Sequence, residues 1–508
     1  MARAAPRRPW AGRIGRLLTP SMVDIFFVAL LMAAFVRPGW QQLLADGDTG
    51  WHIRTGQLVL AEGRAPRVDR FSFTRPGERW CAWEWLSDAA FALMFAAGGL
   101  EAVAKLAGAV LCLAAAVVFA WLLRRGSGLW IALAVTLAAV NASSVHYLAR
   151  PHVFSILLYA VSLWILDEAG RGRPLLLWML PPLCALWANL HAGFVVLPAT
   201  LLLAAAVDAA RRRFHPAWRY LAAAMACLAA SLLNPYGWKL DQHILSYLRS
   251  PWILNHVQEF QSPDFRSEGT LVFAILLLGG AALASRTIAR GNWFEGILAL
   301  AWGFAALRSA RHIPLFAMAV APVIADECAR WWRREAERAA PRSPVQILWQ
   351  TAQDLGCRGA TVWLPVLGAA AAMAAPAVPI GFPADRFPVQ AVERNAGLLA
   401  PAGRMPRVLT SDQWADYLIY RFYPRERVFF DGRSDFYGPR LGADYSALQT
   451  GAENWRALVA RYRFDLALLP RAWPLDAGLA GQPGWQPVYE DSVAVLYRRT
   501  AVRRRGER

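Results

Sequence analysis

Hydrophobic residues in the first 382 positions come in blocks of about 15–24, separated by arginine clusters, prolines, glycines or asparagines. About 20 apolar residues cross the hydrocarbon core of a bilayer, and shorter blocks cross it with help from flanking residues. The pattern predicts about eleven transmembrane helices, at 20–37, 101–123, 128–146, 152–168, 174–190, 192–210, 216–233, 269–285, 293–308, 312–328 and 360–382. The stretch at 86–97 is too short to span and is predicted to be an interfacial or re-entrant helix.

Arginines between these blocks predict the orientation of the chain. Five of them precede the first block, and more follow at Arg124-Arg125 and at Arg211-Arg212-Arg213. Because basic residues stay on the cytoplasmic side, we expect a protein of the bacterial inner membrane with a cytoplasmic N-terminus. The first periplasmic loop then covers about 38–84, a second covers about 234–267, and a cytoplasmic amphipathic segment covers about 330–358.

The C-terminal part, 383–508, has the composition of a soluble protein and alternates strand-like with helix-like segments. It predicts a small periplasmic α/β domain. The sequence Asp431-Gly432-Arg433 follows one of its expected strands. The expected fold class is therefore an all-α polytopic membrane domain, 1–382, followed by a soluble α/β domain.

Composition narrows the function classes. Hydrophobic residues make up 56% of the 508 positions and charged residues 18%, which is too few to cover a soluble protein of this size. The formal net charge of +18 is spread through membrane-flanking loops, so it does not indicate a nucleic-acid partner. The six cysteines show no C-x-x-C spacing, and no Walker A, G-x-G-x-x-G or G-x-S-x-G motif stands in a suitable context.

Polar residues gather on the predicted outer side. Seven of the eight histidines fall at outer helix ends or in outer loops, all except His215. Ionisable residues at membrane spans are costly and tend to mark functional cavities. The candidate site residues on this side are Asp46, Asp48, His52, Glu84, Arg150, His152, Asn189, His191, Asn234, Tyr236, Glu259, Arg308, Arg311 and His312.

The densest cluster opens the first outer loop, as Asp46-Gly47-Asp48 followed by Trp51-His52. Two carboxylates on either side of a glycine can turn toward one point, as a base with its orienting partner or as a base and a metal ligand. Pro and Gly break the helices beside several outer arginines and histidines, whose charge suits an anionic headgroup.

These motifs together resemble the GT-C superfamily of membrane glycosyltransferases, which use polyprenyl-phosphate-linked sugars. Protein O-mannosyltransferases, lipid A aminoarabinose transferases and oligosaccharyltransferases belong to it, and the motifs look most like those of uncharacterised bacterial members. The resemblance rests on Asp46-x-Asp48-x-x-Trp51-His52, Glu84-Trp85-Leu86, Arg150-Pro151-His152, Trp187-x-Asn189-x-His191-x-Gly193, Asn234-Pro235-Tyr236-Gly237 and Asp431-Gly432-Arg433.

The resemblance implies a donor, an acceptor and a mechanism. A lipid-linked sugar would be the donor, and Asp46 or Asp48 would act as general base on a periplasmic acceptor, with inversion at the anomeric carbon. Arg308, Arg311 and His312 would stabilise the leaving phosphate, with Arg150 and His152 in reserve. Some relatives hold a divalent metal at the D-x-D motif, so Mg²⁺ or Mn²⁺ on Asp46, Asp48 and His52 stays an alternative.

Two other classes compete with the transferase. A lipid or glycan flippase would carry internal repeats and polar residues near the bilayer midplane, and the chain has no obvious repeat. A non-catalytic GT-C-like subunit of cell-envelope assembly would keep the architecture without the activity. Such a scaffold would tolerate Asp→Asn changes at both Asp46 and Asp48, whereas a transferase would not.

Overall fold

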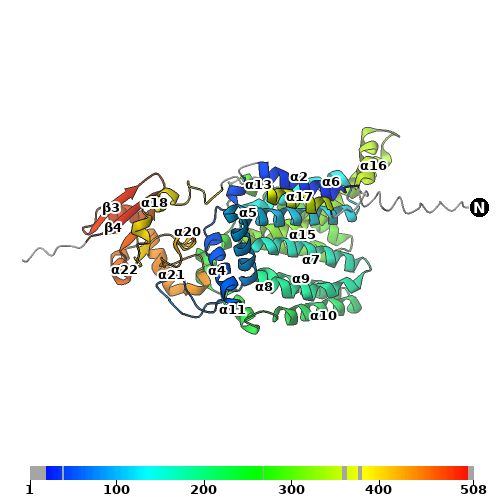
Figure 1. Cartoon of the computed structure of the whole chain (residues 1–508). Helices are drawn as coiled ribbons and strands as arrows, with labels where there is room; N and C mark the ends of the chain where they lie inside the picture. The colour runs from blue at the N-terminus through cyan, green and yellow to red at the C-terminus, as the bar shows by residue number, and fades with distance from the viewer. Residues whose placement is uncertain (1–18, 37–38, 267, 357–362, 376–379, 501–508) are drawn as a thin grey trace, which may run out of the picture.

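The computed structural model describes residues 19–36, 39–266, 268–356, 363–375 and 380–500. A bundle of long helices forms one part of the molecule, and a small domain with a β-sheet packs against one of its ends (Figure 1). We call the end of the bundle that contacts this domain the outer end, and the opposite end the inner end. The predicted basic N-terminus, 1–18, lies outside the described residues.

Among the described residues, six helical stretches are long and apolar enough to cross a membrane: Trp85–Arg124, Leu129–His146, His152–Gly170, Ala192–Ala210, Gly269–Ala289 and Ala310–Arg338. Shorter apolar helices cover Met22–Ala34, Pro174–Leu190 and Trp363–Ala374. The main elements of the bundle are α2 (Met22–Val36), α5 (Trp85–Arg124), α6 (Leu129–Ser143), α7 (His152–Gly170), α8 (Leu180–Leu190), α9 (Val196–Ala210), α10 (Phe214–Ser231), α13 (Glu268–Ala289), α14 (Trp293–Arg308), α15 (Ile313–Arg338) and α17 (Trp363–Ala374).

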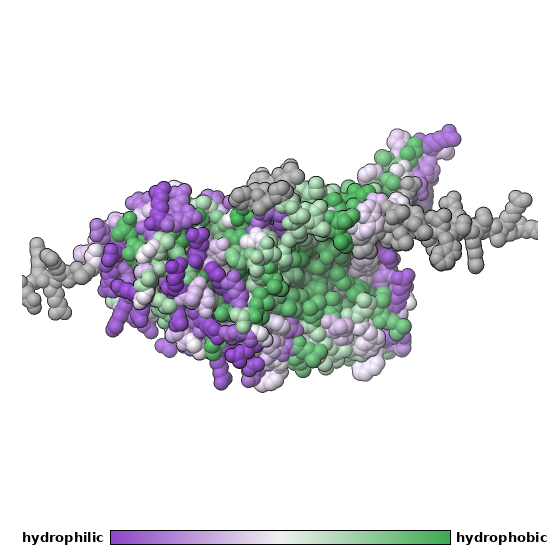
Figure 2. Space-filling view, viewed as in Figure 1, coloured by the Kyte–Doolittle hydropathy of each residue, from purple (hydrophilic) through white to green (hydrophobic). Residues whose placement is uncertain are grey.

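The surface of the bundle agrees with a membrane environment. In the space-filling view apolar side chains cover the bundle, while polar ones cover the C-terminal domain (Figure 2). Large apolar side chains such as Leu278 and Phe304 are more than half exposed on it. A soluble protein rarely exposes so continuous an apolar surface. Such a surface is suited to contact with the lipid of a membrane.

The predicted short stretch at 86–97 is the first part of α5. Gly98 and Gly99 interrupt this helix with non-helical backbone, and Gly99 has a φ of 65° that favours glycine. The kink lets Trp85 to Ala97 pack under the first outer loop while the rest of α5 continues through the bundle.

The first outer loop contains two helices, α3 (Gly39–Gln42) and α4 (Asp48–Glu62). A glycine-lined face of α4 allows close packing on both sides. A Cβ at Gly56 would overlap the backbone carbonyl of Asp88 in α5, and a Cβ at Gly50 would overlap the carbonyl of Asp416. The loop is therefore clamped between the bundle and the C-terminal domain.

The other extramembrane segments are short helices. The second outer loop contains α11 (Trp238–Leu248), α12 (Pro251–His256) and η4 (Gln258–Phe260). At the inner end, α15 continues to Arg338, and α16 (Pro344–Gly356) follows. The segment predicted as amphipathic, 330–358, therefore divides between the end of a long helix and a separate one, and its last two residues lie outside the described ones.

The C-terminal domain has a four-stranded sheet in the order β1-β2-β4-β3, with β1 (Val408–Leu409) parallel to β2 (Leu466–Pro470). β4 (Ala494–Arg499) pairs antiparallel with β2 and with β3 (Trp485–Glu490). The helices of this domain are α18 (Val389–Arg394), α19 (Ala396–Leu399), α20 (Asp412–Phe422), α21 (Ser434–Thr450), α22 (Trp455–Tyr462) and α23 (Pro474–Ala480).

Buried groups join this domain to the first outer loop. The Arg433 guanidinium contacts the Asp69 carboxylate at 2.8 Å and the Asp431 carboxylate at 2.6 Å, and all three side chains are almost fully buried. Tyr437 donates to the same Asp431 at 2.7 Å. The Asp431-Gly432-Arg433 motif thus fixes the C-terminal domain to the first outer loop through buried ion pairs.

Candidate active site

One arginine at the outer end gathers three carboxylates. Arg150, just before α7, contacts Asp46 at 3.1 Å and Asp48 at 2.7 Å, and it pairs with Glu259 of η4. Asp46 also accepts the backbone N–H of Asp48 at 2.9 Å, which sets the turn into α4. Four residues predicted from the sequence therefore form one cluster, although 213 positions separate the first from the last.

The carboxylates of this cluster have pKa values that are shifted in opposite directions. Burial would raise the pKa of Glu259, but Arg150 and its cationic neighbours outweigh it and hold that pKa well below the usual range. At Asp48 burial wins over the attraction of Arg150 and raises the pKa to about 7, with Asp46 contributing further. Glu259 is thus a stable counter-ion for Arg150, while Asp48 sits close to the proton-exchange range.

The C-terminal domain supplies a fourth carboxylate, Asp416 of α20. Its Oδ1 accepts the backbone N–H of Gly432 at 3.1 Å. Its Oδ2 and the Asp48 Oδ1 are buried without a hydrogen-bond partner in the described structure, and both lie next to Gly432, where a Cβ would overlap the Asp48 oxygen. Burial and the charge of Asp48 raise the pKa of Asp416 well above its usual range, which favours the protonated form of Asp416 beside Asp48.

A second chain of polar groups runs beside this cluster, through His52, Glu84 and His191. His52 Nδ1 lies 2.6 Å from the Asp88 carboxylate, and its Nε2 lies 3.6 Å from Glu84. The other Glu84 oxygen lies 3.4 Å from His191 Nε2. Burial raises the pKa of Glu84 to about 8 and lowers that of His52, so both groups are mostly uncharged at neutral pH.

His191 connects this row of polar groups to the core of the bundle. Its Nδ1 lies 2.7 Å from the Ser155 hydroxyl and accepts the Gly193 backbone N–H at 3.0 Å. The Trp187 indole donates to the same hydroxyl at 2.6 Å. Because Nδ1 accepts from the backbone, Nε2 is the protonated nitrogen of neutral His191 and points toward Glu84.

A cavity of about 700 Å³ opens at this level between α7, α8, α11, α14 and α15. Its lining combines apolar side chains with six of the cationic or histidine groups at the outer end: His146, His152, His191, Arg308, Arg311 and His312. The Arg311 guanidinium stacks 4.5 Å from the Phe260 ring centre, next to Glu259 in the chain. Phe260 therefore connects the cavity wall to the Arg150 cluster.

Three of the predicted site residues make hydrogen bonds that hold the outer loops in place. Asn189 accepts the Trp85 indole N–H at 2.9 Å. Asn234 accepts the Tyr236 backbone N–H at 2.7 Å, and the Tyr236 hydroxyl donates to the Pro66 carbonyl at 2.9 Å. These contacts tie the two outer loops together, and none of the three side chains lines the cavity.

The predicted metal set of Asp46, Asp48 and His52 is not brought together. Both ring nitrogens of His52 face Asp88 and Glu84, while Arg150 occupies the Asp46 and Asp48 oxygens. Among the described residues no group of three or more His, Cys, Asp or Glu side chains could hold a metal ion. Arg150 already supplies the positive charge that a cation would bring, so these residues do not fit Mg²⁺ or Mn²⁺.

Sequence reasoning missed Asp88, Ser155 and Asp416. Asp88 and Ser155 lie inside apolar helices, where they look like isolated polar residues. Asp416 lies in an ordinary amphipathic helix more than 360 positions from Asp48. A signal did exist for Asp88, because it stands four residues after Glu84 and therefore on the same helix face.

Comparison with known proteins places the fold. A scan against models of protein families finds no match, and neither does a search of curated proteins. Among solved structures, the chain is similar to the archaeal oligosaccharyltransferase AglB from Archaeoglobus fulgidus, in complex with an inhibitory peptide and a dolichol-phosphate. The TM-score is 0.52 at 12% identity, over 91% of this chain and 70% of that one.

A second similar structure is ArnT from Cupriavidus metallidurans bound to undecaprenyl phosphate. The TM-score is 0.50 at 13% identity, over 94% of this chain and 98% of that one. Both structures cover the helical bundle together with a C-terminal domain, so the likeness is not limited to a few packed helices. The expected resemblance is confirmed at the level of the fold, which the chain shares with these two structures.

Proposed function

We propose that the protein is a membrane glycosyltransferase that moves a sugar from a polyprenyl-phosphate-linked donor to an acceptor at the outer face of the membrane. The observation that carries this proposal is the outer cavity, which joins an apolar lining to Arg308, Arg311 and four histidines beside buried carboxylates. The GT-C fold supports it, since both similar structures hold a lipid phosphate.

The donor phosphate would bind at the cavity wall formed by Arg308, Arg311 and His312. Arg308 is exposed at the end of α14, and η5 carries the other two side chains. An arginine fork suits phosphate oxygens, and the apolar lining suits the start of a polyprenyl chain. As the bond to the sugar breaks, negative charge grows on this phosphate, and the fixed cations stabilise it.

The acceptor would be deprotonated by Asp46. Asp48 Oδ2 contacts Arg150, and its Oδ1 is buried beside Asp416. The Asp46 side chain is 13% exposed, against 5% for Asp48. Asp46 is therefore the more accessible base, and Asp48 with Asp416 positions it through Arg150 and the shared turn.

The transfer step follows from these roles. The acceptor oxygen forms a bond to the anomeric carbon while its proton passes to the Asp46 carboxylate. The bond from that carbon to the phosphate oxygen breaks, and the polyprenyl phosphate leaves as an anion beside Arg308 and Arg311. Attack from the face opposite the phosphate inverts the anomeric configuration.

The proposed location follows the arginine pattern. Residues 1–382 would form the transmembrane GT-C-like domain in a bacterial inner membrane, with the site and the α/β domain of 383–508 on the periplasmic side. A lipid, a glycan or a protein would be the acceptor, and the cell envelope is where such acceptors occur.

Purified protein and a panel of polyprenyl-phosphate sugars test the proposal. We expect sugar transfer or donor hydrolysis, lost by at least about 100-fold in D46N, as for other electrostatic catalytic groups. D385N is the matched control, because Asp385 lies in the loop before α18, outside both clusters and outside the cavity lining. Full transfer by a normally folded D46N/D48N double variant would overturn the assignment of these carboxylates to the catalytic base.

A further inference from the structure

A second cavity, of about 580 Å³, lies at the inner end of the bundle, opposite the proposed active site. The helices that enclose it are α5, α7, α9, α10, α14 and α15, and its lining contains six arginines and four carboxylates. The proposed transfer reaction uses none of these groups. The cavity is therefore available for a role that does not depend on the proposed function.

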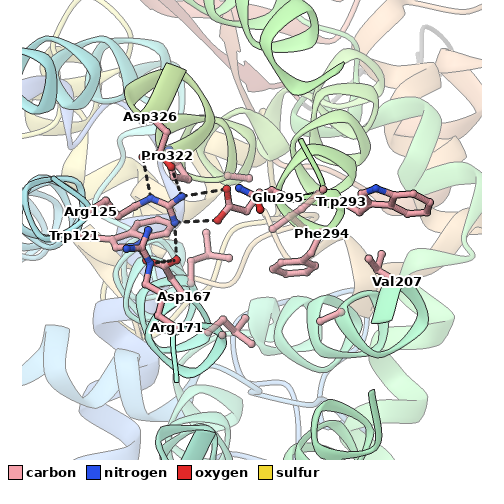
Figure 3. Close-up of a pocket in the computed structure, with 18 of the residues that line it drawn as sticks. Trp121, Arg125, Asp167, Arg171, Val207, Trp293, Phe294, Glu295, Pro322 and Asp326 are labelled. Atoms are coloured by element: carbon pink, nitrogen blue, oxygen red, sulfur yellow. Dashed lines mark hydrogen bonds and ion pairs between the residues drawn. The ribbon is translucent and has the colours of Figure 1, made fainter. Parts of the chain in front are cut away.

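The deep part of this cavity is a closed ion-pair network. Figure 3 shows Arg125 surrounded by Asp167, Glu295 and Asp326. The guanidinium lies 2.6, 3.0 and 2.5 Å from these carboxylates, and its side chain is only 2% exposed. Each of its terminal nitrogens already faces a carboxylate, so Arg125 has little capacity left for an external anion.

The rim of the cavity behaves differently. Among the described residues, neither Arg211 nor Arg333 makes an ion pair. Arg211 donates to the Gly291 carbonyl and lies 5.4 Å from the Trp293 ring centre, while Arg333 lies 5.8 Å from the Trp349 ring centre. Both guanidinium groups therefore keep donors for a further acceptor.

Arg330, which lines the same cavity, has a buried donor without an acceptor among the described residues. One of its terminal nitrogens contacts Glu327 at 2.5 Å, but its Nε is buried and finds no acceptor in the described structure. A buried donor without an acceptor is costly. A phosphate oxygen entering the cavity would satisfy it.

We propose that the rim arginines Arg211, Arg330 and Arg333 bind the phosphate group of an anionic phospholipid headgroup from the leaflet at the inner end. Basic pockets between membrane helices are suited to such headgroups. Trp293 and Phe294 line the same cavity, with Trp293 39% exposed, and give the glycerol and the first acyl carbons an apolar surface. A soluble phosphate ester shares the headgroup chemistry, so the experiment separates the two sources.

Native mass spectrometry of the purified full chain tests the proposal with phosphatidylglycerol and, separately, with glycerol 3-phosphate. We expect retention of phosphatidylglycerol, and a loss of affinity of about tenfold or more in R211Q/R333Q. R212Q/R334Q is the matched control, because Arg212 and Arg334 are exposed next-door neighbours that do not line the cavity. We expect the control to change affinity by less than about twofold.

Three results decide the matter. Equal losses in both double variants would overturn the proposal, since general attraction to the basic inner surface would then explain binding. Retention of neither probe would overturn it as well. Equal affinity for glycerol 3-phosphate would keep the phosphate site and reject the lipid as its source. If R211Q/R333Q fails to fold, R333Q alone gives the same comparison, because Arg333 is exposed.

Discussion

The two ends of the bundle carry the same ionic motif in different surroundings. Arg125 at the inner end and Arg150 at the outer end each contact three carboxylates, which come from three separate segments at Arg125 and from two at Arg150. The Arg125 side chain is 2% exposed, and that of Arg150 is 22% exposed. The inner cluster joins four helices through buried, fully paired charges, and we call it the clamp. The outer cluster borders the Asp48–Asp416 pair and lies near a cavity lined by histidines.

The difference in exposure between the two arginine clusters suggests that the inner one stabilises the fold and the outer one serves the proposed reaction. A buried arginine that is fully paired contributes packing and specificity but no spare donor. The outer cluster mixes an arginine with carboxylates whose pKa values are pushed apart, Glu259 downward and Asp48 upward. Divergent pKa values among neighbouring carboxylates are typical of acid–base sites.

The largest expected effect comes from removing the inner arginine. R125L leaves Asp167, Glu295 and Asp326 buried without their cation, and we expect a loss of about 3–5 kcal/mol in the free energy of unfolding, or no folded protein. Thermal unfolding in detergent measures it. R124Q is the control, because the Arg124 side chain is 59% exposed and its ion-pair contact with Glu168 is 4.0 Å long. Equal losses in both variants would contradict the clamp.

Removing the outer arginine should damage activity more than stability. In R150Q we expect transfer to fall by at least about 100-fold, because Asp46 and Asp48 lose the group that holds them. The free energy of unfolding should fall by about 1–3 kcal/mol, less than in R125L, since water already reaches this cluster. Paired activity and melting measurements check the ratio, and an R150Q protein with normal transfer would reject the proposed site.

The carboxylate pair predicts a pH dependence of stability. The pKa values of Asp48, about 7, and of Asp416 are raised in the folded protein, so the folded state binds more protons than the unfolded one above about pH 4. The contribution of this pair to stability is therefore largest at acid pH and falls as the pH rises toward 7, by up to about 1.4 kcal/mol per pH unit for each group.

The D416N variant isolates this contribution. An asparagine at 416 donates to Asp48 without needing a proton, so we expect a flatter curve of unfolding free energy between pH 5 and pH 7. D385N serves as the control, because Asp385 is an exposed carboxylate in the loop before α18. An identical slope for D416N and the unmodified protein would show that the two carboxylates do not share a proton.

The smallest expected effect concerns one hydrogen bond of the inner cluster. Trp121 donates its indole N–H to Asp167 at 2.7 Å. W121F removes this donor and keeps an aromatic ring, so we expect a loss of about 1 kcal/mol with transfer activity unchanged. A drop in activity of tenfold or more in W121F would mean that the two ends are coupled, and the contrast between clamp and site would need revision.

Much of the architecture was predictable from local patterns. Apolar blocks predict most helices of the bundle because a span must satisfy its own backbone groups and face lipid. The short block at 86–97, predicted as a separate interfacial or re-entrant helix, is the first part of α5 in the structure, and the Gly98–Gly99 kink sets it apart from the rest of that helix. The structure does not bring the alternative metal set of Asp46, Asp48 and His52 together, because the ring orientation of His52 depends on Asp88, a residue that stands inside an apolar helix.

Composition and periodicity alone determined that this chain is a helical membrane protein with a soluble C-terminal domain, and they pointed to one end of the bundle as the place for chemistry. Hydrophobicity and charge act locally, so a single sequence carries them in full. Tertiary structure decided which polar residues meet. Asp48 gains Asp416, Arg150 gains Glu259, and Arg125 becomes a closed clamp only after distant segments pack, since burial and pairing depend on contacts that no local pattern encodes.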